Sequence, residues 1–137
     1  MEDIKQQLEI IKEYIIKEFD PLAIILFGSY SRNSQNEESD IDIAIISDVL
    51  DRKKIFKEKQ NLQEIIKKDI DLINLKSDEI YDSFRYEVLM NGIVLFCKDE
   101  YKYDLYKIDM IREYIELNES REDIIKRIKN GGTIYGK

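Results

Sequence analysis

Short apolar runs rich in β-branched residues alternate with longer amphipathic segments along most of this chain. Apolar side chains recur at three- and four-residue steps where helices are expected, at 2–18, 52–67 and 77–91. The apolar runs between these segments have the length of buried strands and cover 22–27, 40–46, 69–75 and 93–97. This alternation favours an α/β layer structure in which helices flank a sheet of about four strands.

The expected helix boundaries carry their own signals. Pro21 marks the end of the first helix, because proline cannot continue the helical hydrogen-bond ladder. Asp48 or Asp51 is expected to cap the second helix and Ser77 the third, since short side chains with an oxygen accept hydrogen bonds from free backbone N–H groups. Gly92 is a typical C-terminal stop for the third helix.

The length of 137 residues suits a single compact domain. We expect a core over about 2–97, C-terminal helical structure over about 100–130, as one helix or two, and a flexible tail over 131–137. No apolar run reaches the roughly 18 residues of a membrane helix, and the acidic start lacks the basic character of a secretory signal. The sequence therefore predicts a cytoplasmic protein without a membrane span.

Charge and missing residue types narrow the chemistry. The formal net charge of −7 argues against a surface that follows a nucleic-acid backbone, so direct nucleic-acid binding is not expected. The chain contains no histidine, which excludes histidine-activated nucleophiles and histidine-containing zinc sites. Its single cysteine, Cys97, lies in an apolar run and is expected to be a buried free thiol. Carboxylates must therefore carry any acid–base or metal chemistry.

A Gly-Ser pair follows the first strand-like run. Gly28 lets the backbone turn and approach a ligand closely, because glycine has no side chain. The hydroxyl of Ser29 and nearby backbone N–H groups are suited to holding phosphate oxygens. Arg32 is placed to add positive charge to the same loop. These three residues are candidate phosphate ligands.

Three aspartates interrupt apolar strand-like runs. Asp40 and Asp42 follow Ser29 after ten intervening residues, and Asp71 lies in a further run. Side chains two apart on a strand leave the same face, about 6.6 Å apart at a rise of about 3.3 Å per residue. Neighbouring carboxylates repel without a cation, and hard oxygen ligands select Mg²⁺ or Mn²⁺. The alternative is a solvated strand edge or a helix cap, but charges are costly in apolar strands, which favours a metal site.

This pattern resembles the signature of the minimal nucleotidyltransferases of the DNA polymerase beta-like superfamily, a Gly-Ser pair followed by a spacer and Asp-x-Asp. The match covers residues 27–43, and the order of helices and strands is similar over roughly 2–97. The loop departs from the family pattern, which commonly continues with a small residue and a glycine where this chain has Ser31 and Asn33. The resemblance implies a polymerase beta-like nucleotidyltransferase fold with a mixed sheet and a C-terminal helical segment.

The resemblance also implies a role for each matching residue. Gly28 and Ser29 would grip a nucleoside triphosphate, and Asp40 and Asp42 would ligate the metal. Asp71 would be the third acidic residue, either a metal ligand or the base that activates the attacking hydroxyl. The implied reaction is the transfer of a nucleoside monophosphate to a hydroxyl group.

Chains of this length in the superfamily include the antitoxins of two-gene modules whose partner is a helical HEPN-domain ribonuclease toxin. Some of these antitoxins adenylylate a tyrosine of the toxin. This short, acidic chain resembles that group, which implies Mg²⁺-dependent transfer of AMP from ATP to such a partner. Two alternatives stay open: an antitoxin that neutralises its partner by occlusion, and a transferase acting on a small molecule of the aminoglycoside type. Assembly as a homo-oligomer or hetero-oligomer also stays open.

Overall fold

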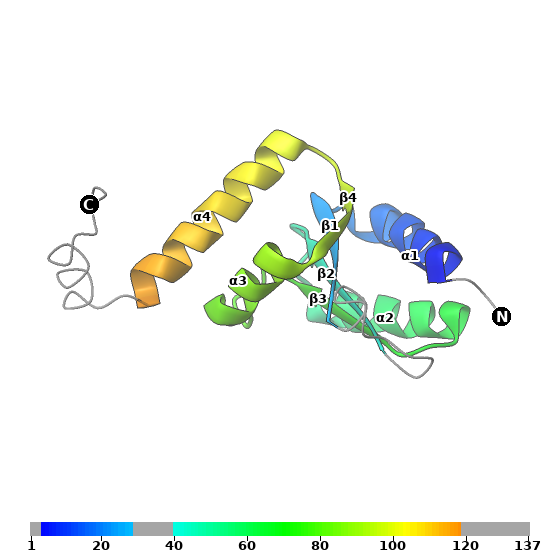
Figure 1. Ribbon diagram of the computed structural model, residues 1–137. Coiled ribbons are helices and arrows are strands. Elements are labelled where there is room, and N and C mark those ends of the chain that lie inside the picture. Colours follow the sequence, from blue (N-terminus) through cyan, green and yellow to red (C-terminus); the bar gives the residue numbers. More distant parts are fainter. Residues whose placement is uncertain (1–3, 29–39, 119–137) are drawn as a thin grey trace, which may run out of the picture.

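The computed structural model describes residues 4–28 and 40–118, in which helices and strands alternate (Figure 1). The helices are α1 (Ile4–Phe19), α2 (Arg52–Ile66), α3 (Asp82–Asn91) and α4 (Glu100–Asn118). The strands are β1 (Ala23–Phe27), β2 (Ile41–Ile46), β3 (Ile70–Asn74) and β4 (Ile93–Cys97). These elements confirm the segments that apolar spacing predicts. The predictions for 119–130 and for the tail over 131–137 lie outside the described residues.

The strands form one mixed sheet in the order β3-β2-β1-β4. β1 pairs antiparallel with both β2 and β4, whereas β2 and β3 are parallel. α1 and α2 cover one face of this sheet, and α3 and α4 lie on the opposite face (Figure 1). The predicted α/β architecture, a mixed sheet flanked by helices, is confirmed.

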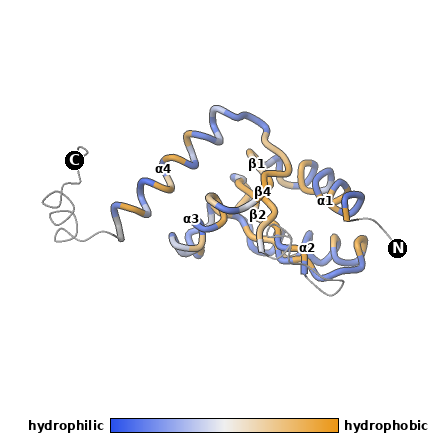
Figure 2. Tube along the Cα trace, in the orientation of Figure 1, coloured by the Kyte–Doolittle hydropathy of each residue, from blue (hydrophilic) through white to orange (hydrophobic). Residues whose placement is uncertain are grey.

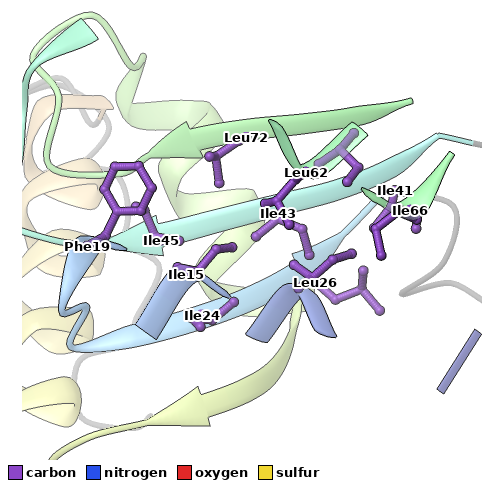
Figure 3. Close-up of a cluster of buried hydrophobic side chains, with 12 residues drawn as sticks. Ile15, Phe19, Ile24, Leu26, Ile41, Ile43, Ile45, Leu62, Ile66 and Leu72 are labelled. Atoms are coloured by element: carbon purple, nitrogen blue, oxygen red, sulfur yellow. The ribbon is translucent and has the colours of Figure 1, made fainter. Parts of the chain in front are cut away.

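Alternate strand residues build the core beneath α1 and α2. Ile41, Ile43 and Ile45 of β2 all point to this face and are fully buried (Figure 3). The buried side chains that meet them from the two helices are Ile11, Ile15, Phe19, Leu62 and Ile66. Burial of one such isoleucine stabilises the fold by about 1.5–3 kcal/mol. The intervening residues of β2 must therefore face the other side of the sheet.

A second apolar cluster fills the space under α3 and α4. Val88 and Leu89 of α3 and Tyr103 of α4 pack there against alanines and isoleucines of β1 and β2. Hydrophobic and hydrophilic residues alternate along the helices in Figure 2, as one-sided burial requires. Cys97 lies at the edge of this cluster as a free, partly buried thiol, and burial raises its pKa. The prediction of a free thiol is confirmed, but its burial is incomplete.

Two predicted helix boundaries are confirmed. The Asp51 carboxylate caps α2 by accepting a 3.0 Å hydrogen bond from the N–H of Lys53. Gly92 ends α3, and its N–H donates a 2.8 Å hydrogen bond to the carbonyl of Val88. Gly92 also joins α3 directly to β4, which fixes this helix against the sheet.

The predicted start of the third helix at Ser77 is wrong, because α3 begins only at Asp82. The side chain of Arg85 explains the delay. Its guanidinium donates hydrogen bonds to the carbonyls of Leu75 at 2.8 Å and of Ser77 at 3.2 Å. The Ser77 carbonyl also accepts a 3.3 Å hydrogen bond from the N–H of Ile80, and the Ser77 hydroxyl accepts one of 3.2 Å from the N–H of Glu79. Ser77 therefore caps a turn after β3, and α3 starts only beyond that turn.

A buried polar network closes the carboxyl ends of β2 and β3. The Asn74 amide donates to the carbonyls of Ser47 at 2.9 Å and Val49 at 3.0 Å, and its oxygen accepts from the N–H of Lys76 at 3.1 Å. The Ser47 hydroxyl in turn donates to the carbonyl of Phe19 at 2.7 Å. Both side chains are buried, and the network ties the two parallel strands together.

Candidate active site

Register places two predicted aspartates side by side. Asp42 of β2 is the direct partner of Asp71 in the parallel ladder, and Asp42 also faces Phe27 across the antiparallel ladder with β1. Adjacent strands lie about 4.8 Å apart, and residues at paired positions project to the same face. Asp71, Asp42 and Phe27 therefore form a row across three strands, on the face that carries α3.

Strand alternation explains this placement. The neighbours of Asp42, Ile41 and Ile43, are fully buried beneath α1 and α2. In β3, Ile70 is buried in the same cluster, so Asp71 must point to the opposite face. Asp42 is partly buried and Asp71 is exposed. The apolar residues that build the core thus also determine where the carboxylates lie.

Asp40 stands directly before β2 and is exposed. It lies two residues before Asp42, so strand alternation would carry its side chain to the same face. The N–H of Ile41 donates a 3.0 Å hydrogen bond to the carbonyl of Asp69, which keeps β2 and β3 paired up to this end. Asp40 therefore lies at the same edge of the sheet as Asp42 and Asp71.

Gly28 lies against the Asp42 carboxylate. Its φ of +75° is in the left-handed region, where residues with side chains are strained. A Cβ added at Gly28 would lie 2.0 Å from Oδ2 of Asp42, far inside a van der Waals contact. Glycine is therefore required after the first strand for two reasons: the backbone conformation is left-handed, and the Asp42 carboxylate occupies the space of a side chain.

Two predicted ligands, Ser29 and Arg32, lie outside the described residues. Within 4–28 and 40–118, no three acidic or cysteine side chains are gathered into a set that could hold a metal ion. The structure brings Asp40, Asp42 and Asp71 to one sheet edge, yet their carboxylates do not form a ready-made cage.

A pocket of about 610 Å³ opens beside Gly28, on the side away from β2 and β3. Its walls come from the end of β1, from α3 and from the turn into β4, and the lining residues are Phe27, Gly28, Phe84, Glu87, Val88, Asn91 and Gly92. Sequence reasoning missed the residues of α3 in this list. The sequence indicates only that the third helix is followed directly by a strand. It does not indicate that this strand pairs with β1, and that pairing brings α3 next to Gly28.

An α/β fold with helices on both faces of the sheet, and with paired strand aspartates beside a glycine turn, is the arrangement of a nucleotidyltransferase. The sequence matches the family described as Polymerase beta, Nucleotidyltransferase, over residues 9–101. This chain belongs to that family, and the implied fold is confirmed by solved relatives. Its enzymatic class is nucleotidyltransferase.

Individual proteins similar to this chain have a more specific activity than the family description gives. The chain is 33% identical to protein adenylyltransferase MntA of Shewanella oneidensis over 103 residues, which are 74% of this chain and 72% of the relative. It is similar to a chain in a crystal structure of a toxin–antitoxin with AMP-PNP, at 30% identity and a TM-score of 0.73, covering 88% of this chain and 95% of that one. A structure of tri-AMPylated Shewanella oneidensis HEPN toxin in complex with MNT antitoxin matches at 27% identity and a TM-score of 0.71, covering 89% and 95%.

The structure also bears on the prediction that the chain has no membrane span. No helix in residues 4–28 and 40–118 combines the length and the apolar composition that crossing a bilayer needs. The longest of the described helices, α4, has charged residues on most of its turns.

Proposed function

We propose that this chain transfers AMP from ATP to a tyrosine hydroxyl of a partner HEPN-type ribonuclease toxin in the cytoplasm, and so acts as its antitoxin. The row formed by Asp42 and Asp71 beside Gly28 is the observation that carries the proposal. Support for AMP and for a protein acceptor comes from the similarity to the adenylyltransferase MntA and to the complex that contains an AMPylated toxin.

We propose that Mg²⁺ or Mn²⁺ binds to Asp42 and Asp71, with Asp40 as a third ligand. The donor set fits these hard cations, because it consists of carboxylates and the described residues near it include no thiol or imidazole. Since the three carboxylates are not already gathered, binding would draw them together by changing side-chain rotamers on a rigid pair of strands. When bound, the cation would neutralise negative charge on the phosphates.

The residues of the chain have separate tasks in this reaction. The backbone at Gly28 approaches the triphosphate closely, with Ser29 and Arg32 as further phosphate ligands. Asp71 accepts the proton of the acceptor hydroxyl as its oxygen attacks the α-phosphorus. The bond from the α-phosphorus to the bridging oxygen breaks, and pyrophosphate leaves with that oxygen. The protein contributes positioning and electrostatic stabilisation, as in other phosphoryl transfers.

The direct test uses the purified protein, Mg²⁺, ATP labelled at the α-phosphate, and the protein encoded by the neighbouring gene. A labelled partner is expected with the natural chain and no label with Asp42→Asn. Asp48→Asn is the matched control, because Asp48 is an exposed aspartate just beyond the other end of the same strand. Absence of label with the natural chain would overturn the proposal.

Protection of cells separates catalysis from occlusion. Under the proposed function, cells that express the toxin survive with the natural chain or Asp48→Asn, and die with Asp42→Asn. Survival with Asp42→Asn, at equal amounts of folded protein, would mean that binding alone neutralises the toxin. Transfer of label to an aminoglycoside but not to the partner would instead assign the chain a small-molecule acceptor.

A further inference from the structure

Two aromatic rings line the pocket beside Gly28. Phe27 and Phe84 meet edge to face, with ring centroids 5.4 Å apart and planes at 85°. Phe84 remains 37% exposed, so part of its ring is open to a ligand. Flat aromatic groups bind such surfaces by stacking, and base–aromatic stacking is a general device for holding nucleobases.

The rim of the pocket carries polar groups that have no task within the fold. Glu87 and Asn91 lie one turn apart on α3 and both are exposed. Their side chains make no hydrogen bond or ion pair with another residue in the described part of the chain. An asparagine amide offers an NH₂ group that donates and an oxygen that accepts, whereas a carboxylate offers only acceptors. This combination suits a heterocycle that has an amino group next to a ring nitrogen.

Position decides which group the pocket would receive. The strand order is β3-β2-β1-β4, so Asp71 and Asp42 lie on one side of Gly28 and the pocket lies on the other. An acceptor hydroxyl that gives its proton to Asp71 must approach over β3. The nucleotide is left with the opposite side, where its triphosphate passes Gly28 and its base extends towards α3.

Resting on the proposed function, we propose that this pocket binds the adenine base of ATP. The base stacks on the Phe84 ring, and the Asn91 amide donates to one ring nitrogen while it accepts from the exocyclic amino group. The Glu87 carboxylate is a second acceptor for that amino group. A guanine base in the same orientation would place a carbonyl where adenine has its amino group, and that carbonyl would meet the Glu87 carboxylate unfavourably. The pocket thus makes α3 the element that selects the nucleotide.

Binding measurements test the pocket without relying on transfer activity. The full chain is titrated with ATP and, separately, with inorganic tripolyphosphate, both with Mg²⁺. Phe84→Ala should raise the dissociation constant for ATP by about 5- to 100-fold, the usual range for loss of one base–aromatic stack, and leave that for tripolyphosphate unchanged. Phe56→Ala is the matched control, because Phe56 is 62% exposed on α2, on the opposite face of the sheet.

Asn91→Ala gives a second test, since an exposed residue at the end of α3 can be replaced without loss of the core. It should reduce the preference for ATP over GTP about tenfold, the effect of one good pair of base contacts. Unchanged ATP affinity in Phe84→Ala, or an unchanged ATP-to-GTP ratio in Asn91→Ala, would overturn the adenine pocket while the transferase function stands. A natural chain that binds neither ATP nor tripolyphosphate would instead defeat the proposed function itself.

Discussion

The two ends of β2 and β3 use polar side chains in opposite ways. At the carboxyl ends, Asn74 and Ser47 are buried and hydrogen-bonded to the backbone around them. At the amino ends, Asp42 and Asp71 are in direct register, so two like charges stand on adjacent strands. The same pair of strands thus carries a network whose partners lie inside the protein and a pair of groups suited to a ligand from outside.

The contrast separates polar residues that stabilise the fold from polar residues that serve chemistry. A buried amide with all its hydrogen bonds made adds stability, and removing it leaves several backbone groups unsatisfied. Asp42 and Asp71 carry like charges on adjacent strands, and like charges repel, so a bound cation should stabilise this end of the sheet. Substitutions at the amino ends should therefore change transfer activity, whereas substitutions at the carboxyl ends should change the free energy of unfolding.

The largest expected effect is on catalysis, from Asp71→Asn. Transfer of labelled AMP should fall by about 10²- to 10⁴-fold, the usual contribution of a general base. The midpoint of thermal unfolding without metal should stay the same or rise, because repulsion with Asp42 is relieved. Both quantities are measured on one preparation. A clear drop in unfolding temperature would show that Asp71 is a structural residue and that the contrast between the strand ends is false.

The next effect is on stability, from Asn74→Ala. The free energy of unfolding should fall by about 3 kcal/mol, because buried backbone groups of Ser47 and Val49 lose their partner. Urea denaturation measures the loss, and the folded fraction should retain its transfer activity. Asn61→Ala is the control, since the Asn61 amide donates a 3.1 Å hydrogen bond to the Glu58 side chain and holds no backbone group, so its loss should cost much less. Equal losses in the two variants would contradict the structural role of the network.

Gly28→Ala probes the contact between the backbone and the functional end. The left-handed φ should lower the free energy of unfolding by about 1–2 kcal/mol, and the new methyl group would displace the Asp42 carboxylate and reduce transfer. A double-mutant cycle with Asp42→Ala separates the two causes, because only the clash disappears when the carboxylate is removed. Identical costs in both backgrounds would mean that the carboxylate and Gly28 are not in contact.

Much of the fold could be predicted from the sequence, because periodicity reports which face of each element is buried. The spacing of Ile41, Ile43 and Ile45 is enough to predict a strand with one face in the core, and the structure confirms it. The start of α3 could not be read in this way. Ser77 has the chemistry of a cap, but its hydroxyl caps a turn, and hydrogen bonds from the Arg85 side chain to the carbonyls of Leu75 and Ser77 hold that turn before α3. Helical periodicity does not report such side-chain contacts.

The candidate site shows the same limit. Asp42 and Asp71 could be predicted as a pair from their residue type and from the alternation of side chains along each strand, both of which the sequence shows. Their direct register and the strand order are not, since these depend on how distant segments pair. For this reason the carboxylates were predicted, whereas the pocket formed by α3 beside Gly28 was found only in three dimensions.

The smallest expected effect concerns a carboxylate that already has its partners. Glu58 of α2 is buried between the layers, where the Tyr14 hydroxyl and the Asn61 amide donate hydrogen bonds to it. The hydrogen bond from Tyr14, more than any other contact, holds the pKa of Glu58 below its ordinary range. This carboxylate should therefore behave as part of the fold.

Tyr14→Phe tests this through pH. Because the folded-state pKa of Glu58 is lowered, the stabilisation is fully present above the ordinary glutamate pKa and disappears as the pH falls through the folded-state pKa. The natural chain should exceed the variant by about 1 kcal/mol in free energy of unfolding near neutral pH, and the difference should vanish in acid. Urea denaturation at a series of pH values measures it, with Tyr81→Phe as control, since the exposed Tyr81 makes no such bond. A difference that stays constant with pH would place the Tyr14 contribution in packing and remove Glu58 from the set of partnered carboxylates.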